Sequence, residues 1–288
     1  MNHLKYADFH CHSLNSDGKY TIQEVIDIAR KANIKYLALT DHNKLMPDFD
    51  MYQKKNSDIV LIKGSEISSI FQFSSGKEIE IHIIALFLEN TEEILDVLKK
   101  NNQNNEDWIK RIILKLKEVG IALGTYEEIQ KDFPGRQIRR MLLAEFMVKK
   151  GITSSVDIAL NKYIGDRGER LAWEPCTIEY APYTHVINAI HRAKGVSILA
   201  HPLSYVLSEQ EQQELLESFK NAGGDALEVL YGAYSEEQRK QLKTYADVLE
   251  LGYSCGSDFH GYSKNDTMDN HFPTEVYNQL LRLKKSVL

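Results

Sequence analysis

The 288-residue chain has 43% hydrophobic and 26% charged residues, which is enough apolar sequence to bury a core and excludes a globally disordered protein. Its formal net charge of -6 offers no basic face for wrapping a duplex, which excludes duplex DNA as a partner. The three cysteines, Cys11, Cys176 and Cys255, are far apart without a CxxC pair, which excludes a disulfide framework and favours a reducing cytoplasm.

No run approaches about 18 apolar residues, and the opening stretch MNHLKYADFH has no apolar signal region. We therefore expect a cytoplasmic protein with no membrane partner, and the sequence indicates no obligate protein partner. The length allows either one barrel of alternating strands and helices with an insertion, or two small domains.

The first 90 residues alternate between helix-like and strand-like patterns. The stretch TIQE at 21–24 has the form of a capping box, and apolar residues follow it at helical spacing, which predicts a helix of about three turns. Short β-rich runs at 35–40, 59–66 and 79–88 each stop at a polar residue. The link SSIFQFSSGK at 68–77 carries no helical signal, so this connection departs from the simple parallel rule.

From Thr91 to about Ile164 the sequence is mostly helical and polar. We expect residues 1–90 and 176–288 to form one α/β barrel domain, with residues 91–175 as a mainly helical insertion that caps the barrel mouth. The run NNQNN at 101–105 is typical of a short exposed linker.

The strand-helix rhythm returns after the insertion. Helices are predicted near 182–194, 208–222 and 235–250, and they alternate with the strand-like runs VSILAHP, ALEVLYG and GYSCGSDFHG. Seven strand candidates in all, most of them separated by helices, predict an α/β barrel with its helices outside.

Histidines and carboxylates recur where the predicted strands end. His10 and His12 share one face of a strand while Cys11 points to the other, because side chains alternate along a strand. The carboxyl ends of barrel strands meet at one mouth, so residues far apart in sequence are expected to converge there. The expected shell comprises His10, His12, Asp17, His42, Glu66, His82, His201, Asp258 and His260.

Six imidazoles and three carboxylates exceed what one cation uses. Four to six donors for each ion predict two or three divalent metal ions, with a carboxylate shared between them. Two bland alternatives remain, since a strand histidine is often simply packed and Glu66 or Asp258 could instead cap a helix. Arginines from the insertion could bind phosphate at the mouth, although most such side chains are solvated. These arginines are Arg136, Arg139, Arg140, Arg167 and Arg170.

The motifs HCHSLNSDG, LTDHN, GSEIS, EIHIIAL, LAHP and GSDFHG, in this order over residues 7–262, resemble those of the PHP family, named for polymerase and histidinol phosphatase. The SDG and the long insertion are most similar to the stand-alone bacterial branch, which includes nucleoside 3',5'-bisphosphate phosphatases and a 5'-to-3' exonuclease of short RNA. The resemblance implies a distorted seven-stranded (β/α)7 barrel and a trinuclear site that holds manganese, iron or zinc.

The resemblance also implies a role for individual residues. His10, His12, Glu66 and Asp258 match one metal position, Glu66, His82 and His201 a second, and Asp17, His42 and His260 the third, so that Glu66 bridges. Arg136 matches the arginine of a Gly-Arg-Pro-His run that holds phosphate, but Gln137 and Ile138 replace the proline and histidine. Near the end of the insertion, Glu174-Pro175-Cys176 stands where relatives tend to have a lysine or arginine.

Together these features predict a metal-dependent phosphoesterase. A hydroxide held between the ions near Glu66 would attack phosphorus, Arg136 would neutralise the phosphoryl oxygens, and Asp258 or His201 would handle protons. The expected substrate is a small phosphate monoester, with a nucleoside 3',5'-bisphosphate or the 5' end of a short RNA as the candidates.

Three alternatives stay open at this point. The first is a histidinol-phosphate-type or other small-molecule phosphatase. The second is an amidohydrolase that cleaves C–N bonds, which would have no obvious need for Asp17, His42 and His260. The third is a non-catalytic, metal-stabilised binding module, although a structural site needs no open coordination.

Overall fold

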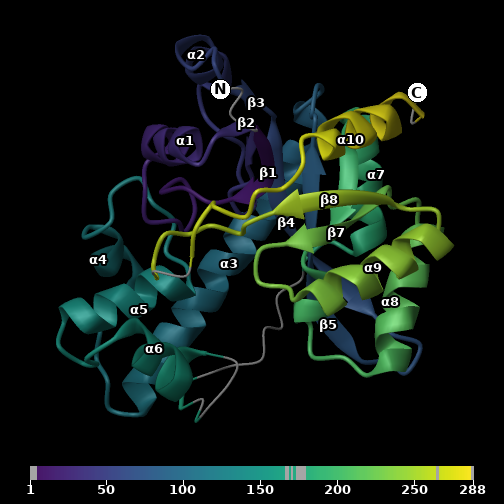
Figure 1. Ribbon diagram of the computed structural model, residues 1–288. Helices are drawn as coiled ribbons and strands as arrows, with labels where there is room; N and C mark the ends of the chain where they lie inside the picture. Colours follow the sequence, from purple (N-terminus) through teal and green to yellow (C-terminus); the bar gives the residue numbers. More distant parts are fainter. Residues whose placement is uncertain (1–4, 166–168, 170, 173–179, 264–265, 287–288) are drawn as a thin grey trace.

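The computed structural model describes residues 5–165, 169, 171–172, 180–263 and 266–286 (Figure 1). The strands are β1 (Tyr6–Cys11), β2 (Ile34–Leu39), β3 (Val60–Leu61), β4 (Gly64–Gln72), β5 (Glu78–Leu86), β6 (Val196–Leu199), β7 (Ala226–Tyr231) and β8 (Gly252–Gly256). The helices are α1 (Ile22–Lys31), α2 (Phe49–Lys55), α3 (Glu92–Glu118), α4 (Tyr126–Gln130), α5 (Arg140–Lys149), α6 (Val156–Ala159), α7 (Tyr183–Arg192), α8 (Glu209–Asn221), α9 (Glu236–Val248) and α10 (Glu275–Ser286). A π-helical turn, η1 (Leu160–Ile164), continues α6, and a 3-10 turn, η2 (Pro202–Ser204), follows β6.

The strands form two sheets. β1, β2 and β3 make a parallel three-stranded sheet, and β4 to β8 follow one another in a five-stranded sheet. β5 runs antiparallel to both β4 and β6, whereas β6, β7 and β8 are parallel. The link at 68–77 is therefore part of an antiparallel hairpin, which explains why it carries no helical signal.

Single bridges join the two sheets at both seams. Cys11 bridges Phe259 between β1 and the end of β8, and His42 bridges Glu66 on the other side. The mixed α/β class is confirmed. The expected seven-stranded barrel is not, because the described residues form two open sheets that contain eight strands in all. The run at 59–66 gives two strands because a new pairing with β5 begins at Gly64, where an added Cβ would lie 2.7 Å from the carbonyl oxygen of Ala85.

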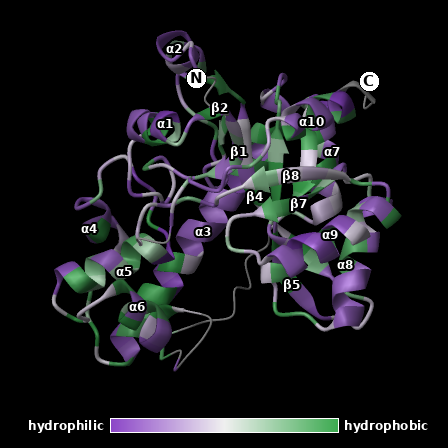
Figure 2. Cartoon of the chain, in the orientation of Figure 1, coloured by the Kyte–Doolittle hydropathy of each residue, from purple (hydrophilic) through white to green (hydrophobic). Residues whose placement is uncertain are grey.

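The helices begin where their capping residues predict. Thr21 and Glu24 form the expected capping box of α1, and Ser208 with Glu211 and Ser235 with Gln238 do the same for α8 and α9. Such reciprocal bonds satisfy amide groups that a helix start leaves unpaired. Figure 2 shows these outer helices mixing polar and apolar residues along their length, as amphipathic elements do.

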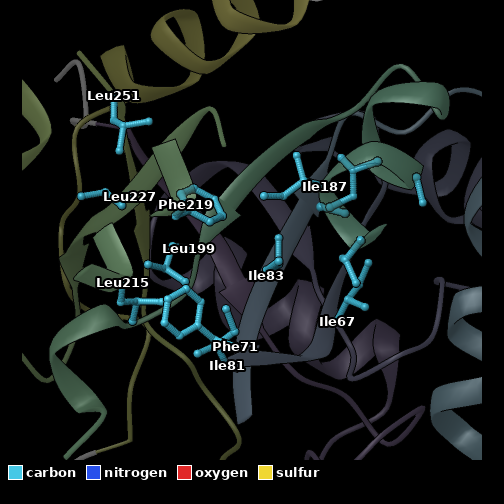
Figure 3. Close-up of a cluster of buried hydrophobic side chains, with 14 of the residues drawn as sticks. Ile67, Phe71, Ile81, Ile83, Ile187, Leu199, Leu215, Phe219, Leu227 and Leu251 are labelled. Atoms are coloured by element: carbon cyan, nitrogen blue, oxygen red, sulfur yellow. The ribbon is translucent and has the colours of Figure 1, made fainter. Parts of the chain in front are cut away.

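The main core lies between the five-stranded sheet and helices α7, α8 and α9 (Figure 3). Ile67 pairs with Ile83 across β4 and β5, and both side chains are fully buried in this core. Because side chains alternate along a strand, the neighbouring Glu66 and His82 must face the opposite side of the sheet. The same alternation that builds the core thus fixes which side chains can form a site.

The helices of the predicted insertion pack around an apolar cluster of their own. Trp108, Ile112, Leu143 and Phe146 belong to this cluster, which is distinct from the cores around the sheets. In Figure 1, α4, α5 and α6 lie on the side of α3 away from α8 and α9. The division into a barrel domain and an insertion stays a prediction, and its boundary at 175 and 176 falls outside the described residues.

The interpretation of NNQNN as an exposed linker is wrong. These residues lie in the middle of the 27-residue helix α3, where Asn101 and Asn105 are buried. The side chain of Asn101 donates to Asn43 Oδ1 at 2.8 Å and to the carbonyl oxygen of Ser68 at 2.7 Å. A buried helix face can be polar when each carboxamide finds partners across the interface.

Across the part of the chain that is described, no helix combines the length and apolarity needed to cross a bilayer.

Candidate metal centre

All nine residues of the predicted shell converge on one cluster. Three sets of side chains each have ligand atoms within 4.8 Å of one another. The sets are His10, His12, Glu66 and Asp258; His12, Asp17, His42 and His260; and His42, Glu66 and His82. The first set matches the grouping expected from sequence, and His12 joins the expected set of Asp17, His42 and His260. In the third set His42 stands where His201 was expected. His201 belongs to none of the three sets, although its Nε2 lies 3.0 Å from Glu66 Oε1.

Glu66 lies at the middle of the cluster and is 1% exposed. Its Oε1 contacts His82 Nδ1 at 2.8 Å and His201 Nε2 at 3.0 Å, and its Oε2 contacts His42 Nδ1 at 2.9 Å and the Nε2 atoms of His10 and His12 at 3.3 Å each. The expectation that Glu66 ends a strand is wrong, because β4 begins only at Gly64 and Glu66 lies near its start. Its central place nevertheless suits a bridging carboxylate.

The two aspartates complete the outer sets. Asp258 Oδ1 lies 3.1 Å from His12 Nε2 and 3.3 Å from His10 Nε2. The two carboxylate oxygens of Asp17 each lie 3.5 Å from an Nε2 atom, Oδ1 from that of His260 and Oδ2 from that of His42. The loop after β1 thus delivers Asp17 to a different set of histidines from the one that His10 joins.

The buried donor atoms fit divalent metal ions. A buried polar atom without a hydrogen bond is costly, so such atoms are uncommon in folded proteins. Here they cluster, and they include His10 Nε2, both ring nitrogens of His12, His42 Nδ1, Glu66 Oε2 and His201 Nδ1. Imidazole and carboxylate donors that face one another without hydrogen bonding are what zinc, iron or manganese would satisfy.

Opposite charges stabilise one another throughout the cluster. Burial lowers the pKa of His82, but the Glu66 and Glu80 carboxylates together outweigh burial and raise that pKa to about 10. Burial also lowers the pKa of His260, but neighbouring carboxylates, Asp17 foremost, outweigh burial and raise that pKa to about 10. Burial raises the pKa of the Asp258 carboxyl, yet His10 and His260 hold it below its usual range. A metal ion bound by these imidazoles would have to displace their protons.

Two carboxylates outside the predicted shell, Asp41 and Glu228, hold the cluster in place. Asp41 is buried and accepts hydrogen bonds from the amide and hydroxyl groups of Ser13 at 2.8 and 2.7 Å and from the Ser16 hydroxyl at 2.6 Å. Asp41 thereby fixes the loop that presents Asp17. Its position next to His42 at the end of a strand was the available signal. Glu228 carries no such signal, because its partner His10 is 218 residues away.

A cavity of about 430 Å³ adjoins the cluster at Asp17, His42 and His82. Its other walls include Asn105, Trp108, Arg139, Arg140, Tyr180 and Tyr205. Arg139 is 8% exposed and donates to the carbonyl oxygen of His42 at 2.9 Å. The guanidinium of Arg140 lies over the Trp108 ring, 5.4 Å from its centroid.

The predicted phosphate ligand Arg136 lies nearby but does not line this cavity. Its guanidinium donates to the carbonyl oxygen of Gly18, next to Asp17, at 3.2 Å. Burial lowers the pKa of Lys44, and the positive charges of Arg139 and, more weakly, Arg136 lower it further. Lys44, Arg139 and Arg136 thus lie in one region. Arg167 and Arg170 lie outside the described residues.

Comparison with known proteins gives consistent matches. The model of the PHP domain matches residues 8–253 of this chain. The 5'-3' exoribonuclease Rnm of Escherichia coli K12 is 31% identical over 269 residues, which cover 90% of this chain and 88% of that protein. The 3',5'-nucleoside bisphosphate phosphatase of Chromobacterium violaceum is 28% identical over 260 residues, covering 88% of this chain and 86% of that one.

A solved structure from Bifidobacterium adolescentis, assigned as a metal-dependent phosphoesterase, has the same fold. It superposes with a TM-score of 0.80 at 23% sequence identity and covers 97% of this chain and 96% of that chain.

Proposed function

Since the chain belongs to the PHP family and is a metal-dependent phosphoesterase, we propose that it removes phosphate from nucleotides. The candidate substrates are nucleoside 3',5'-bisphosphates and the 5' end of short RNA; two relatives are named as a 3',5'-nucleoside bisphosphate phosphatase and a 5'-3' exoribonuclease. The observation that carries the proposal is the cavity beside the metal centre, whose walls combine guanidinium groups with aromatic rings.

We further propose that the three donor sets hold two or three divalent ions, of manganese, iron or zinc. Bound divalent ions lower the pKa of coordinated water and neutralise the oxygens of a transferring phosphoryl group. Glu66 would hold its place between the sets through its contacts to five histidines, which keep both of its oxygens oriented. Its central position explains why one carboxylate can serve more than one ion.

Asp258 and His201 are the proposed groups for moving protons. The side chain of Asp258 is 21% exposed, and its Oδ2 accepts a hydrogen bond from the Tyr231 hydroxyl at 2.8 Å. The Tyr231 bond fixes one oxygen of the carboxylate, while partial exposure gives it access to substrate or solvent. His201 has one ring nitrogen at Glu66 and the other without a hydrogen-bond partner, so it can accept a proton there.

Arg139 adds a phosphate ligand that the sequence comparison with the family does not assign. Arg139 lines the cavity, and its hydrogen bonds to the His42 carbonyl and to Asn102 both use Nη2, so the rest of its guanidinium can serve a phosphoryl oxygen. A guanidinium presents its donors in a planar fork that matches phosphate. Arg136 remains a proposed phosphate ligand on the Asp17 side, and its Nε lacks a hydrogen-bond partner.

The aromatic walls suit a nucleobase. Trp108 and Tyr180 line the cavity, and Arg140 lies over the Trp108 ring within cation–π distance. Bases stack on aromatic rings and on guanidinium planes with little sequence preference. A small ring such as the imidazole of histidinol phosphate or the phenol of phosphotyrosine, without a ribose beside it, would fill less of this part of the cavity.

Phosphate release from a defined panel tests the proposal. Purified protein loaded with Mn²⁺ is offered nucleoside 3',5'-bisphosphates, short 5'-phosphorylated RNA, histidinol phosphate and phosphotyrosine. We expect kcat/KM for a nucleotide to exceed that for the two other esters at least about tenfold, since base stacking contributes about 1–3 kcal/mol. Equal or greater activity on histidinol phosphate would refute the nucleotide assignment. Glu66→Gln and His10→Ala should both abolish turnover while the chain stays folded.

A further inference from the structure

We propose that Glu228 is a positioning residue that holds two candidate metal ligands from opposite ends of one carboxylate, an inference that rests on the metal centre described above. Glu228 is fully buried on β7. Its Oε1 lies 2.9 Å from His10 Nδ1, and its Oε2 accepts a hydrogen bond from the backbone amide of His201 at 2.7 Å. One side chain therefore contacts a residue of β1 and a residue two positions past the end of β6.

The bond to His10 selects one form of that imidazole. With its proton on Nδ1 donated to Glu228, His10 leaves Nε2 unprotonated, and Nε2 is the atom that faces Glu66 Oε2 and Asp258 Oδ1 at 3.3 Å each. A metal-binding histidine commonly donates its other N–H to a carboxylate, which fixes the ring and raises its basicity. Glu228 is in the right place to do this for His10.

The bond to His201 holds an unfavourable backbone conformation. His201 has φ +32° and ψ +53°, in the left-handed region that non-glycine residues seldom adopt. The Glu228 carboxylate satisfies the amide of this residue, and the conformation places His201 Nε2 3.0 Å from Glu66 Oε1. Such strain persists only where the surroundings over-determine it.

The local fold makes room for this carboxylate. The register of β7 and β8 shifts between Glu228 and Leu230, and such an irregularity re-aims side chains. On the neighbouring strand, Gly256 has no side chain, and an added Cβ would collide with the Cβ of His10 and the carboxylate of Glu228. The backbone where β1, β7 and β8 meet is thus shaped to leave space for the Glu228 carboxylate.

Glu228→Gln separates the two contacts. An amide offers one acceptor oxygen, so it can serve His10 or the His201 amide but cannot accept from both. We expect the Kd for Mn²⁺, measured by competition with a chromogenic chelator, to rise about 10- to 100-fold. Glu228→Asp keeps the charge but shortens the reach by one methylene, and it should weaken Mn²⁺ binding as well. Wild-type affinity in Glu228→Asp would overturn the two-point contact.

Asp225→Asn is a matched control near the start of the same strand. Asp225 Oδ2 contacts His191 Nε2 at 2.9 Å and accepts from the Ser197 amide at 2.8 Å, so it too joins a histidine to a backbone amide, but away from the metal centre. We expect Asp225→Asn to lower the Tm of the metal-free protein without changing the Kd for Mn²⁺. An equal loss of Mn²⁺ affinity in both variants would reduce Glu228 to a merely structural role.

A measurement on the unaltered chain covers the case in which Glu228 variants fail to fold. Nitrogen-15 NMR of the zinc-loaded protein should show His10 with its proton on Nδ1; a proton on Nε2 would refute the proposal. None of these readouts needs a substrate, so a chain that releases no phosphate from nucleotides would refute the proposed function and leave this inference standing.

Discussion

Replacing Asn101 with alanine should destabilise the protein by about 2 kcal/mol, although the residue lies in a run that looks like a surface linker. The substitution removes two buried hydrogen bonds, to Asn43 Oδ1 and to the Ser68 carbonyl. Asn43 Oδ1 keeps its bond from the Ser68 amide, so losing the Asn101 bond costs about 1 kcal/mol at that acceptor. The Ser68 carbonyl is left unpaired by the substitution, which costs about 2 kcal/mol.

Two gains offset part of this cost. Alanine favours a helix over asparagine by up to about 0.7 kcal/mol. The Oδ1 of Asn101 is itself buried without a hydrogen-bond partner, and its removal ends a penalty of roughly 1 kcal/mol. The small cavity left behind adds a cost of about 1 kcal/mol, which brings the net loss back to about 2 kcal/mol.

Urea unfolding of the metal-free protein measures this difference without a contribution from metal binding. Gln103→Ala is the matched control, since Gln103 is two residues away in α3 and its side chain is exposed, with one bond to Asp107 at 3.2 Å. The control should change the free energy of unfolding by less than about 0.5 kcal/mol. Equal effects of the two substitutions would refute the buried polar contact between α3 and the sheet.

Three other outcomes follow from the site. Arg139→Ala should lower kcat/KM for the nucleotide substrate about 10- to 100-fold with an unchanged Kd for Mn²⁺, and unchanged steady-state kinetics would remove Arg139 from substrate binding. Asp41→Asn should weaken binding of the ion nearest Asp17, because the loop loses its anchor; full metal content by mass spectrometry would contradict this. Removing metal with a chelator should lower the Tm, and Mn²⁺ at about 1,000 times its Kd should restore about 4 kcal/mol of stability.

The sequence was informative where a residue's role depends on its near neighbours. The capping box at 21–24 predicted the start of α1, and the strand spacing of His10 and His12 predicted that both rings face one way, as their contacts to Glu66 show. The ends of apolar runs likewise predicted the convergence of His42, His201 and Asp258, which follow β2, β6 and β8. Glu66 near the start of β4 and His82 within the antiparallel β5 join the cluster without ending a strand.

The features that the sequence did not predict depend on contacts between distant segments. Glu228 reads as one polar residue in an ordinary strand until β1 brings His10 beside it. Asn101 resembles a linker residue until Asn43 and Ser68 lie opposite. The division of the run at 59–66 follows from the close approach of β5 at Gly64, which no local pattern records.

The order of the donor residues along the chain predicts the order in which the three donor sets form during synthesis. The set of His42, Glu66 and His82 is complete once the first 82 residues have been synthesised, whereas the other two sets need Asp258 or His260 from the end of the last strand. We expect a nascent chain on the ribosome to be able to hold one ion early. A further ion can bind only after the segment that follows β8 has packed beside β1, so full metal content would report that the two ends of the chain have assembled.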